Sequence, residues 1–355
     1  MQTAAATAPS SEASRLVRET LEEYGELARA RLGDYLGQRE PRRYLYDLVR
    51  DYPHRGGRSL RASLCIAAAR AFGASTDEAL NSAAALEILH NAFLVHDDVE
   101  DDSDRRRGAP TLHQLHGVPV AVNVGDALAV LSLRPLIDNH GPLGPRLALQ
   151  ILQEAERMAR ESVEGQAIEL GWRRDNVMDL QAEDYLHMIL KKTCWYTTIY
   201  PLRVGAILGG RRAGAELPES DCVRLGFFLG AAFQIQDDLL NLIGDEERYG
   251  KELDGDLREG KRTLMLILLT RRASPDDRAR LRGLLARDRH GRSDGDVRWM
   301  RQRLDHHGCI TYARQMAHAL AGAARHEAQL ALAHLPDSRD KRFLQALPAW
   351  MLERA

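Results

Sequence analysis

The sequence predicts an all-α protein, a single large helical bundle around a central cavity. From Ala13 onward the chain is dominated by Ala, Leu, Arg and Glu, which are all strong helix formers. Apolar residues recur at helical spacing, and alternating strand-like runs bounded by turns are hard to find. Hydrophobic residues make up 44% and charged residues 28% of the 355 positions, a composition typical of a soluble globular protein.

One domain is expected over residues 15–355, because no shift in composition marks a linker between domains. Residues 1–14 are rich in Ala, Ser, Thr and Pro, and they are predicted to form a flexible N-terminal tail. This segment lacks the basic region and the apolar core of a secretory signal.

The individual elements follow from apolar spacing and from helix breakers. Residues 77–98 are rich in Ala and Leu at helical spacing, and residues 221–242 are almost uniformly apolar, as expected for a helix buried on most sides. Gly and Pro predict loops at residues 140–145 and 209–219. Ser274, followed by proline and two aspartates, predicts a helix start with serine as the N-cap.

The charge balance and the cysteines exclude several classes of protein. The 49 Lys and Arg nearly cancel the 51 Asp and Glu, so neither a nucleic-acid binder nor a polybasic membrane-surface protein is expected. The four cysteines form no Cys-x-x-Cys pair, which argues against a disulfide framework or a zinc cluster and favours a cytoplasmic location. The apolar run at residues 225–233 is about half of the ~18 residues that a membrane span needs, so no span is expected.

Three carboxylates crowd the end of the first long helix, in the segment HDDVEDDSD. If the helix continues, Asp97 and Asp101 lie on one face with Asp98 beside them. Like charges this close repel each other unless a cation binds there, and all-oxygen ligands favour Mg²⁺. For this motif alone, a solvated acidic helix end is the alternative, whereas an EF-hand is disfavoured because its glycine and closing glutamate are missing.

A second acidic pair, Asp237 and Asp238 in QIQDDLLN, strengthens the metal hypothesis. It repeats the spacing of the first cluster, with Asn241 in the last place. This pair follows a strongly apolar helix, where buried carboxylates require partners. Two helices that present such groups to a shared cavity could hold several Mg²⁺ ions and a diphosphate between them.

Basic residues alternate with the acidic clusters along the sequence. Arginine and lysine are the usual ligands of phosphate oxygens. Each basic residue taken singly is more often a surface charge, but their alternation with acidic clusters predicts a site for two anionic substrates, one bound through metal and one bound directly by cations. They are Arg55, Arg58, Arg61, Arg105, Arg106, Arg107, Lys191, Lys192, Lys251 and Lys261.

Together these motifs resemble those of the trans-isoprenyl diphosphate synthases, the polyprenyl synthetase family that includes farnesyl and geranylgeranyl diphosphate synthases. LHNAFLVHDDVEDDSDRRRGAPTLH (89–113) is similar to the family's first aspartate-rich region, and FQIQDDLLNL (233–242) to its second. YGKELDGDLREGKRTL (249–264) is similar to the lysine-bearing segment that follows. The resemblance runs from about Arg50 to Arg271, and it implies the isoprenoid synthase type I fold, prenyltransferase activity and a homodimer.

The resemblance also implies a role for each matching residue. Three Mg²⁺ ions per active site would be held by Asp97, Asp98, Asp101, Asp237 and Asp238, with help from Gln234 and Asn241. The allylic diphosphate would contact Arg106, Lys192, Lys251 and Lys261. Isopentenyl diphosphate would be bound by Arg58, Arg61, His90 and Arg107, with Thr193 in the same lining. The five aspartates and Lys192 are the predicted catalytic residues.

Three features depart from the family pattern. In GGRSLRA, Arg58 stands where lysine is usual and Ala62 where proline is usual, so charge is kept while geometry can shift. Asn241 replaces the final aspartate of the second motif. Trp195 and Tyr196 stand where small residues are common, and they either shape the pocket or pack in the core.

The implied reaction is the Mg²⁺-dependent head-to-tail condensation of isopentenyl diphosphate with an allylic diphosphate, giving a short-chain all-trans prenyl diphosphate. Phe93 lies one helical turn, about 6 Å, before Asp97, and Ala92 beside it is small. We therefore predict a C20 product, geranylgeranyl diphosphate, with C15 farnesyl or C25 geranylfarnesyl diphosphate as alternatives. A terpene cyclase on this scaffold would abandon the isopentenyl site, and a non-catalytic partner subunit would lose its acidic ligands.

Overall fold

The computed structural model describes residues 12–213, 217–244 and 253–353. Of the predicted tail, residues 1–11 lie outside the described residues, and residues 12–14 already belong to the first helix. Lys251 also lies outside the described residues.

The regular structure is almost entirely helical, which confirms the predicted fold class. The N-terminal half contains α1 (Glu12–Tyr35), η1 (Arg42–Tyr46), α2 (Asp51–His54), α3 (Leu60–Ala71), α4 (Thr76–Glu100), β1 (Arg105–Arg106), β2 (Ala109–Pro110), α5 (Leu112–His116), α6 (Val118–Leu131), α7 (Leu133–Asp138), α8 (His140–Leu143) and α9 (Pro145–Arg174). The C-terminal half contains α10 (Ala182–Ile189), η2 (Leu190–Ile199), α11 (Tyr200–Ala213), α12 (Glu219–Ile243), α14 (Gly255–Glu259), α15 (Leu264–Arg272), α16 (Pro275–Leu285), α17 (Asp294–His306), α18 (Cys309–Ala331) and α19 (Arg339–Leu352). The segments η1 and η2 are π-helical, and β1 and β2 form a small antiparallel hairpin directly after α4.

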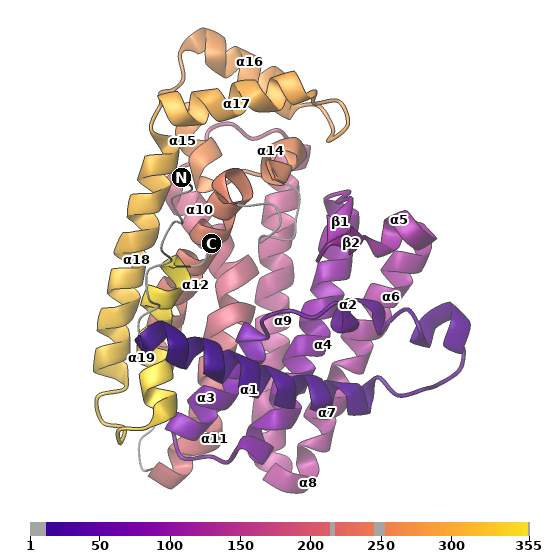
Figure 1. Ribbon diagram of the computed structural model, residues 1–355, viewed down its shortest axis with the longest axis vertical. Coiled ribbons are helices and arrows are strands. Elements are labelled where there is room, and N and C mark those ends of the chain that lie inside the picture. Colours follow the sequence, from indigo (N-terminus) through magenta and orange to yellow (C-terminus); the bar gives the residue numbers. More distant parts are fainter. Residues whose placement is uncertain (1–11, 214–216, 245–252, 354–355) are drawn as a thin grey trace, which may run out of the picture.

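The long helices α4, α9, α12 and α18 form the body of the bundle, while α1 crosses it and α16 and α17 lie across one end (Figure 1). The helix α12 packs against α18 on one side and against η2 on the other, and α9 also packs against η2. The helix α4 is flanked by α3 and α6. The two motif-bearing helices, α4 and α12, therefore belong to one bundle.

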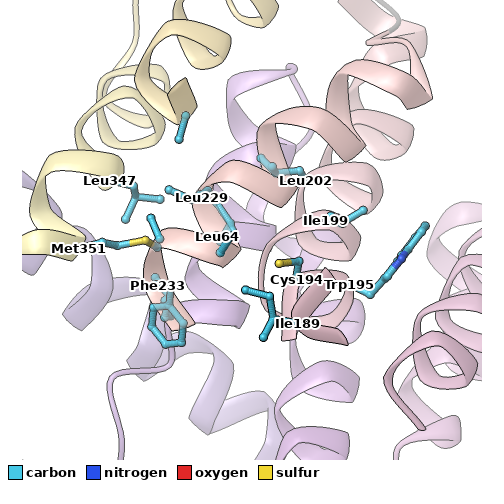
Figure 2. Close-up of a cluster of buried hydrophobic side chains, with 14 of the residues drawn as sticks. Leu64, Ile189, Cys194, Trp195, Ile199, Leu202, Leu229, Phe233, Leu347 and Met351 are labelled. Atoms are coloured by element: carbon cyan, nitrogen blue, oxygen red, sulfur yellow. The ribbon is translucent and has the colours of Figure 1, made fainter. Parts of the chain in front are cut away.

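Two hydrophobic clusters hold the bundle together. The larger cluster joins α3, η2, α11, α12, α18 and α19, and Figure 2 shows a part of it in which Cys194 and Ile199 of η2 lie near Leu229 of α12. The smaller cluster fills the space around α4 and α6 and includes Tyr52 and Ala92.

Two glycines allow neighbouring helices to approach η2 closely. A Cβ atom on Gly165 of α9 would lie 2.2 Å from the backbone nitrogen of Lys192. A Cβ atom on Gly230 of α12 would lie 2.7 Å from Oγ1 of Thr198 and 2.9 Å from Sγ of Cys194. Since real Cβ atoms do not approach so closely, the packing of α9 and α12 on η2 depends on these glycines.

The predicted helix boundaries are confirmed in most places. The predicted segments 77–98 and 221–242 lie within α4 and α12, and the Ser274 side chain caps α16 by accepting a hydrogen bond from the backbone. The predicted loop at residues 140–145 is wrong, because α8 covers its first four residues and α9 begins at its last. Proline is compatible with the first turn of a helix, where its missing N–H has no partner to lose, so Gly and Pro misled the prediction there.

The helical stretch Val118–Leu143 is long and apolar enough to cross a membrane by length and composition alone, with 39% of its most apolar window buried. No apolar stretch of this length was predicted from the sequence, so that prediction is wrong at Val118–Leu143. Its outer face carries the exposed side chains of Val118, Val130, Leu133 and Ile137.

Candidate active site

A cavity of about 630 Å³ opens between α4, α9, η2 and α12. Most of the predicted site residues line it. They are Arg58, Arg61, His90, Phe93, Asp97, Arg106, Arg107, Lys192, Thr193, Gln234, Asp237, Asp238 and Lys261. Asp98, Asp101, Asn241 and Ala92 are not part of the lining.

Of the first two carboxylates of the first acidic motif, Asp97 faces the cavity and Asp98 is buried behind its wall. Asp97 lies in the lining, with its oxygens 3.4 Å from Nζ of Lys192 and 3.5 Å from Nη2 of Arg106. Asp98 is fully buried and accepts hydrogen bonds from Oη of Tyr52 at 2.6 Å and from Nε of Arg106 at 2.9 Å. The Asp98 carboxylate thus anchors Arg106 at the cavity wall.

Asp101, the third acid of this motif, is also buried. It stands at the C-cap of α4, as the predicted continuation of the helix requires. Its carboxylate pairs with Arg173 at the end of α9 and with Nζ of Lys261 at 2.6 Å. Arg173 and Lys261 neutralise the carboxylate of Asp101, which would otherwise be repelled by the carboxylate of Asp97 one helical turn earlier.

The second acidic motif is held by a hydrogen-bond chain. Asp238 accepts hydrogen bonds from Oη of Tyr185 and from Nε2 of Gln234, both at 2.7 Å, and Gln234 in turn accepts one from Oγ1 of Thr193 at 2.8 Å. Burial raises the pKa of Asp238 to about 6, although the two hydrogen bonds favour its ionised form. Asn241 accepts a hydrogen bond from the backbone N–H of Asp256 at 3.0 Å, so it secures the start of α14.

Two half-buried lysines, Lys192 and Lys261, bring positive charge to the carboxylates of the cavity. Burial disfavours the charged form of Lys192, but Glu169 and Asp97 outweigh this effect and raise its pKa. Lys261 lies 2.8 Å from an oxygen of Glu259, whose pKa burial raises to about 7. Asp101 and Glu259 outweigh burial and raise the pKa of Lys261, so both lysines are charged at neutral pH and line the cavity beside the carboxylates.

Arg61 and Arg107 form a second, cationic group in the cavity lining, with His90 beside Arg61. Arg61 donates from Nη2 to Oη of Tyr196 at 2.8 Å, and its Nη1 lies 3.4 Å from Nε2 of His90. Arg107 donates from Nη1 to the backbone carbonyl of Tyr52 at 3.0 Å. These cations line the same cavity as the acidic motifs, and they can bind a second anion there.

The replacement of proline by Ala62 has a structural consequence. The backbone N–H of Ala62 donates to Oε1 of Glu87 at 3.3 Å, a hydrogen bond that proline cannot make. Glu87 is buried in the cavity wall, and burial raises its pKa, although Arg61 favours its ionised form. The alanine thus supplies a donor to a buried carboxylate beneath the cationic group.

Of the residues predicted to affect product length or pocket shape, two line the cavity and two are packed in the core. Phe93 lines the cavity, and its ring meets that of Tyr196 edge-on, with centroids 5.6 Å apart. Ala92 is packed in the smaller hydrophobic cluster instead. Of the two aromatic residues left open by the sequence, Tyr196 lines the cavity, whereas Trp195 is buried outside it beneath Arg157, whose Cζ lies 4.6 Å from the indole centre.

Several residues of the site were missed by sequence reasoning. They contact the predicted residues through hydrogen bonds, ion pairs or, in the case of Trp350, a cation–π contact with Arg58, and all except Glu259 come from distant parts of the chain: Tyr52, Glu87, Glu169, Arg173, Tyr185, Glu259 and Trp350. An isolated tyrosine or glutamate on a helix carries no signal of its partner, although the paired arginines at the end of α9 could have been noted as a basic cluster.

The carboxylates around the cavity are suited to Mg²⁺ that arrives with a diphosphate. Among the described residues, no group of three or more His, Cys, Asp or Glu side chains converges in a metal-binding arrangement. The carboxylates of Asp97, Asp237 and Asp238 nevertheless face one cavity, and Mg²⁺ typically takes only one or two protein carboxylates and completes its shell with water and phosphate. The residues present therefore fit magnesium brought together with a diphosphate.

Comparison with known proteins agrees with this geometry. A short-chain isoprenyl diphosphate synthase of Methanothermobacter thermautotrophicus is 32% identical over 344 residues, which cover 95% of this chain and 98% of that protein. The crystal structure of geranylgeranyl pyrophosphate synthetase from Pyrococcus horikoshii Ot3 has a TM-score of 0.83 at 29% identity, covering 97% of this chain and all of that one. That of geranylgeranyl pyrophosphate synthase from Corynebacterium glutamicum, complexed with isoprenyl diphosphate and magnesium, has a TM-score of 0.79 at 26% identity, covering 97% and 99%.

Other relatives are named geranylfarnesyl and octaprenyl diphosphate synthases, so the named products differ among similar chains. The family model for polyprenyl synthetase matches residues 42–302, which carry both acidic motifs and the cations around the cavity. The chain therefore belongs to the polyprenyl synthetase family, and it is a prenyltransferase that acts as an isoprenyl diphosphate synthase.

Proposed function

We propose that the protein catalyses the Mg²⁺-dependent head-to-tail condensation of isopentenyl diphosphate with an allylic diphosphate. The observation that carries this proposal is that one cavity is lined by two kinds of polar group. The first group consists of the carboxylates of α4 and α12 with Lys192 and Lys261, and the second consists of Arg61, Arg107 and His90. Two diphosphates of different binding mode fit such a cavity.

The acidic group of the lining would bind the allylic diphosphate. Asp97, Asp237 and Asp238 would hold magnesium, and Asp101 could join them by exchanging its pairing with Lys261. The chemistry that magnesium supplies is neutralisation of the charge that develops on the departing diphosphate. Magnesium in the related Corynebacterium structure supports this assignment.

The chain's own residues would position the two substrates, neutralise the charge of their diphosphates and shield the allylic cation from water. Lys192 and Arg106 would contact the allylic diphosphate directly, and Arg106 is oriented for this by its buried pairing with Asp98. Arg61 and Arg107 would bind the second diphosphate with its double bond directed toward the allylic carbon. The apolar walls would exclude water from the allylic cation, so that the double bond of isopentenyl diphosphate attacks the cation instead of water.

The test is product analysis. Protein incubated with Mg²⁺, isopentenyl diphosphate and each allylic primer should yield longer prenyl diphosphates by mass spectrometry, and Asp97→Ala and Asp237→Ala should abolish them. A cyclised hydrocarbon would instead support a terpene cyclase, and no turnover would support a non-catalytic partner subunit. Asp175→Ala, at an exposed carboxylate beyond the end of α9, is the matched control and should retain full turnover.

We further propose geranylgeranyl diphosphate, C20, as the main product, with C15 and C25 as the alternatives. Phe93 lines the cavity one turn before Asp97, where a growing chain would meet its ring. Phe93→Ala should therefore lengthen the product. Leu89→Ala, one turn further back on α4 and outside the cavity lining, should leave product length unchanged. An unchanged product from Phe93→Ala would remove this ring as the floor.

A homodimer is proposed from the apolar outer face of α6 and α7. Val130 and Ile137 are 68% and 53% exposed there, and such a face is costly to leave in water. A second copy of the chain would cover it. Val130→Lys with Ile137→Lys should convert a dimer to a monomer in light scattering, whereas Leu330→Lys on α18, at a 57% exposed position, should not. A monomeric wild-type protein would contradict this proposal.

A further inference from the structure

Tyr196 lines the cavity and contacts three other lining residues, Arg61, His90 and Phe93. Its hydroxyl accepts a hydrogen bond from Nη2 of Arg61 at 2.8 Å, and Cζ of Arg61 lies 4.3 Å from the centre of the same ring. The ring of His90 lies 5.9 Å away, and the ring of Phe93 meets Tyr196 edge-on at 5.6 Å. One side chain therefore contacts both the cationic group and the residue proposed to stop chain growth.

The tyrosine hydroxyl gives Arg61 its well-formed hydrogen bond. The contact between Arg61 and His90 is longer, at 3.4 Å, and Nε of Arg61 is buried with no hydrogen-bond partner among the described residues. The nearby carboxylate of Glu87 attracts Arg61 electrostatically from the cavity wall. Without the hydroxyl, the guanidinium group would lose the contact that fixes its direction against this attraction.

The backbone of η2 fixes the position of Tyr196. Lys192, four residues earlier in this π-helical segment, lines the same cavity, while the intervening Trp195 is buried outside it. The close approach of Gly165 to the backbone of Lys192 leaves η2 little room to shift. Tyr196 is thus presented to the cavity by a rigid element, as a positioning side chain requires.

We propose that Tyr196 is a positioning and specificity-determining residue. Its hydroxyl directs Arg61 toward the diphosphate of isopentenyl diphosphate, and its ring forms, with Phe93, the floor at which the growing chain stops. This inference rests on the proposed condensation. It makes two properties of the enzyme, the affinity for the five-carbon substrate and the length of the product, depend on different atoms of one side chain.

Removing the hydroxyl alone tests the first property. Tyr196→Phe keeps the ring, so we expect the KM for isopentenyl diphosphate to rise about tenfold, the scale of a hydrogen bond to a charged group. The KM for the allylic substrate, kcat and product length should stay at wild-type values. Tyr200→Phe, which removes a buried hydroxyl one turn further along and outside the cavity lining, should change none of these quantities.

Removing the ring tests the second property. Tyr196→Leu should raise the KM for isopentenyl diphosphate as Tyr196→Phe does, and it should also lengthen the product. Phe93→Ala should lengthen the product with the KM for isopentenyl diphosphate unchanged. Because both losses act through one guanidinium group, Arg61→Lys combined with Tyr196→Phe should raise this KM by much less than the product of the single effects.

The outcomes separate this inference from the proposed function. If the wild-type protein makes no elongated diphosphate, the proposed function itself fails. If it elongates but Tyr196→Phe keeps the wild-type KM for isopentenyl diphosphate, or Tyr196→Leu keeps the wild-type product length, only the role of Tyr196 is overturned. Circular dichroism of each variant verifies folding, and Tyr196→Met replaces Tyr196→Leu if the latter does not fold.

Discussion

The two adjacent aspartates of the first motif should respond differently to the loss of their charge. Asp98 is fully buried, and its partner Arg106 is 5% exposed, so Asp98→Asn leaves a buried guanidinium without its counter-charge. Breaking a buried ion pair from one side costs about 3–5 kcal/mol. Asp97 lies 3.4 Å from Lys192 and 3.5 Å from Arg106, longer contacts than those of Asp98, and its side chain is 24% exposed to water. Asp97→Asn should therefore cost less than about 1 kcal/mol.

The assay is urea unfolding followed by circular dichroism, in the presence of a chelator so that bound metal does not contribute to stability. Condensation should be lost in both variants, so activity alone cannot distinguish the two roles. Tyr52→Phe provides an intermediate case, because it removes the 2.6 Å hydrogen bond to Asp98 and the 3.3 Å hydrogen bond from the backbone N–H of Leu112, and should cost about 1.5–3 kcal/mol. Equal unfolding free energies for Asp98→Asn and Asp97→Asn would refute the reasoning, because they would mean that the buried pair with Arg106 contributes nothing specific.

Three further predictions test the packing and the electrostatics of the site. Gly165→Ala should cost about 1–3 kcal/mol in urea unfolding and also lower kcat, because its Cβ would overlap the backbone of η2, whereas Gly171→Ala on the same helix meets no atom within 4 Å and should be neutral or slightly stabilising. Ala62→Pro removes the donor to the buried Glu87 and should destabilise the protein by about 1–3 kcal/mol; an unchanged unfolding midpoint would show that water replaces this donor. Burial raises the folded-state pKa of Asp238 to about 6, so the stability that its protonated form contributes is present below about pH 4 and is lost as the pH rises through about 6. In metal-free buffer, Asp238→Asn should thus gain stability relative to wild type as the pH rises, and parallel stability curves would contradict this.

The sequence predicted those features that depend on local spacing. The positions of α4 and α12 follow from runs of apolar residues, and the placement of Asp97 and Asp237 follows from the helical continuation of those runs. The same reasoning failed at residues 140–143, because Gly and Pro punctuate a chain without deciding whether a short helical turn forms between them. It also failed to notice the apolar stretch that begins at Val118.

The spacing of residues along the sequence could not predict which side chains would pair with the aspartates. Asp98 meets Tyr52, which lies 46 residues earlier, and Asp101 meets Arg173, which lies 72 residues later. The sequence could not decide whether Tyr196 lines the pocket or packs in the core. Neighbouring positions on a helix point in different directions, and only the packing of η2 determines which of them faces the cavity.

The sequence by itself determined the fold class and the chemistry: helical periodicity dictates a bundle, and two acidic motifs among basic residues indicate metal and diphosphate. The tertiary structure alone decided which carboxylates face the cavity and which form buried ion pairs with Arg106 and Lys261. It also decided which aromatic ring contacts Arg61. The physical reason is that burial and charge pairing arise between segments far apart in the chain, so the environment of each ionisable group is a property of the packed bundle.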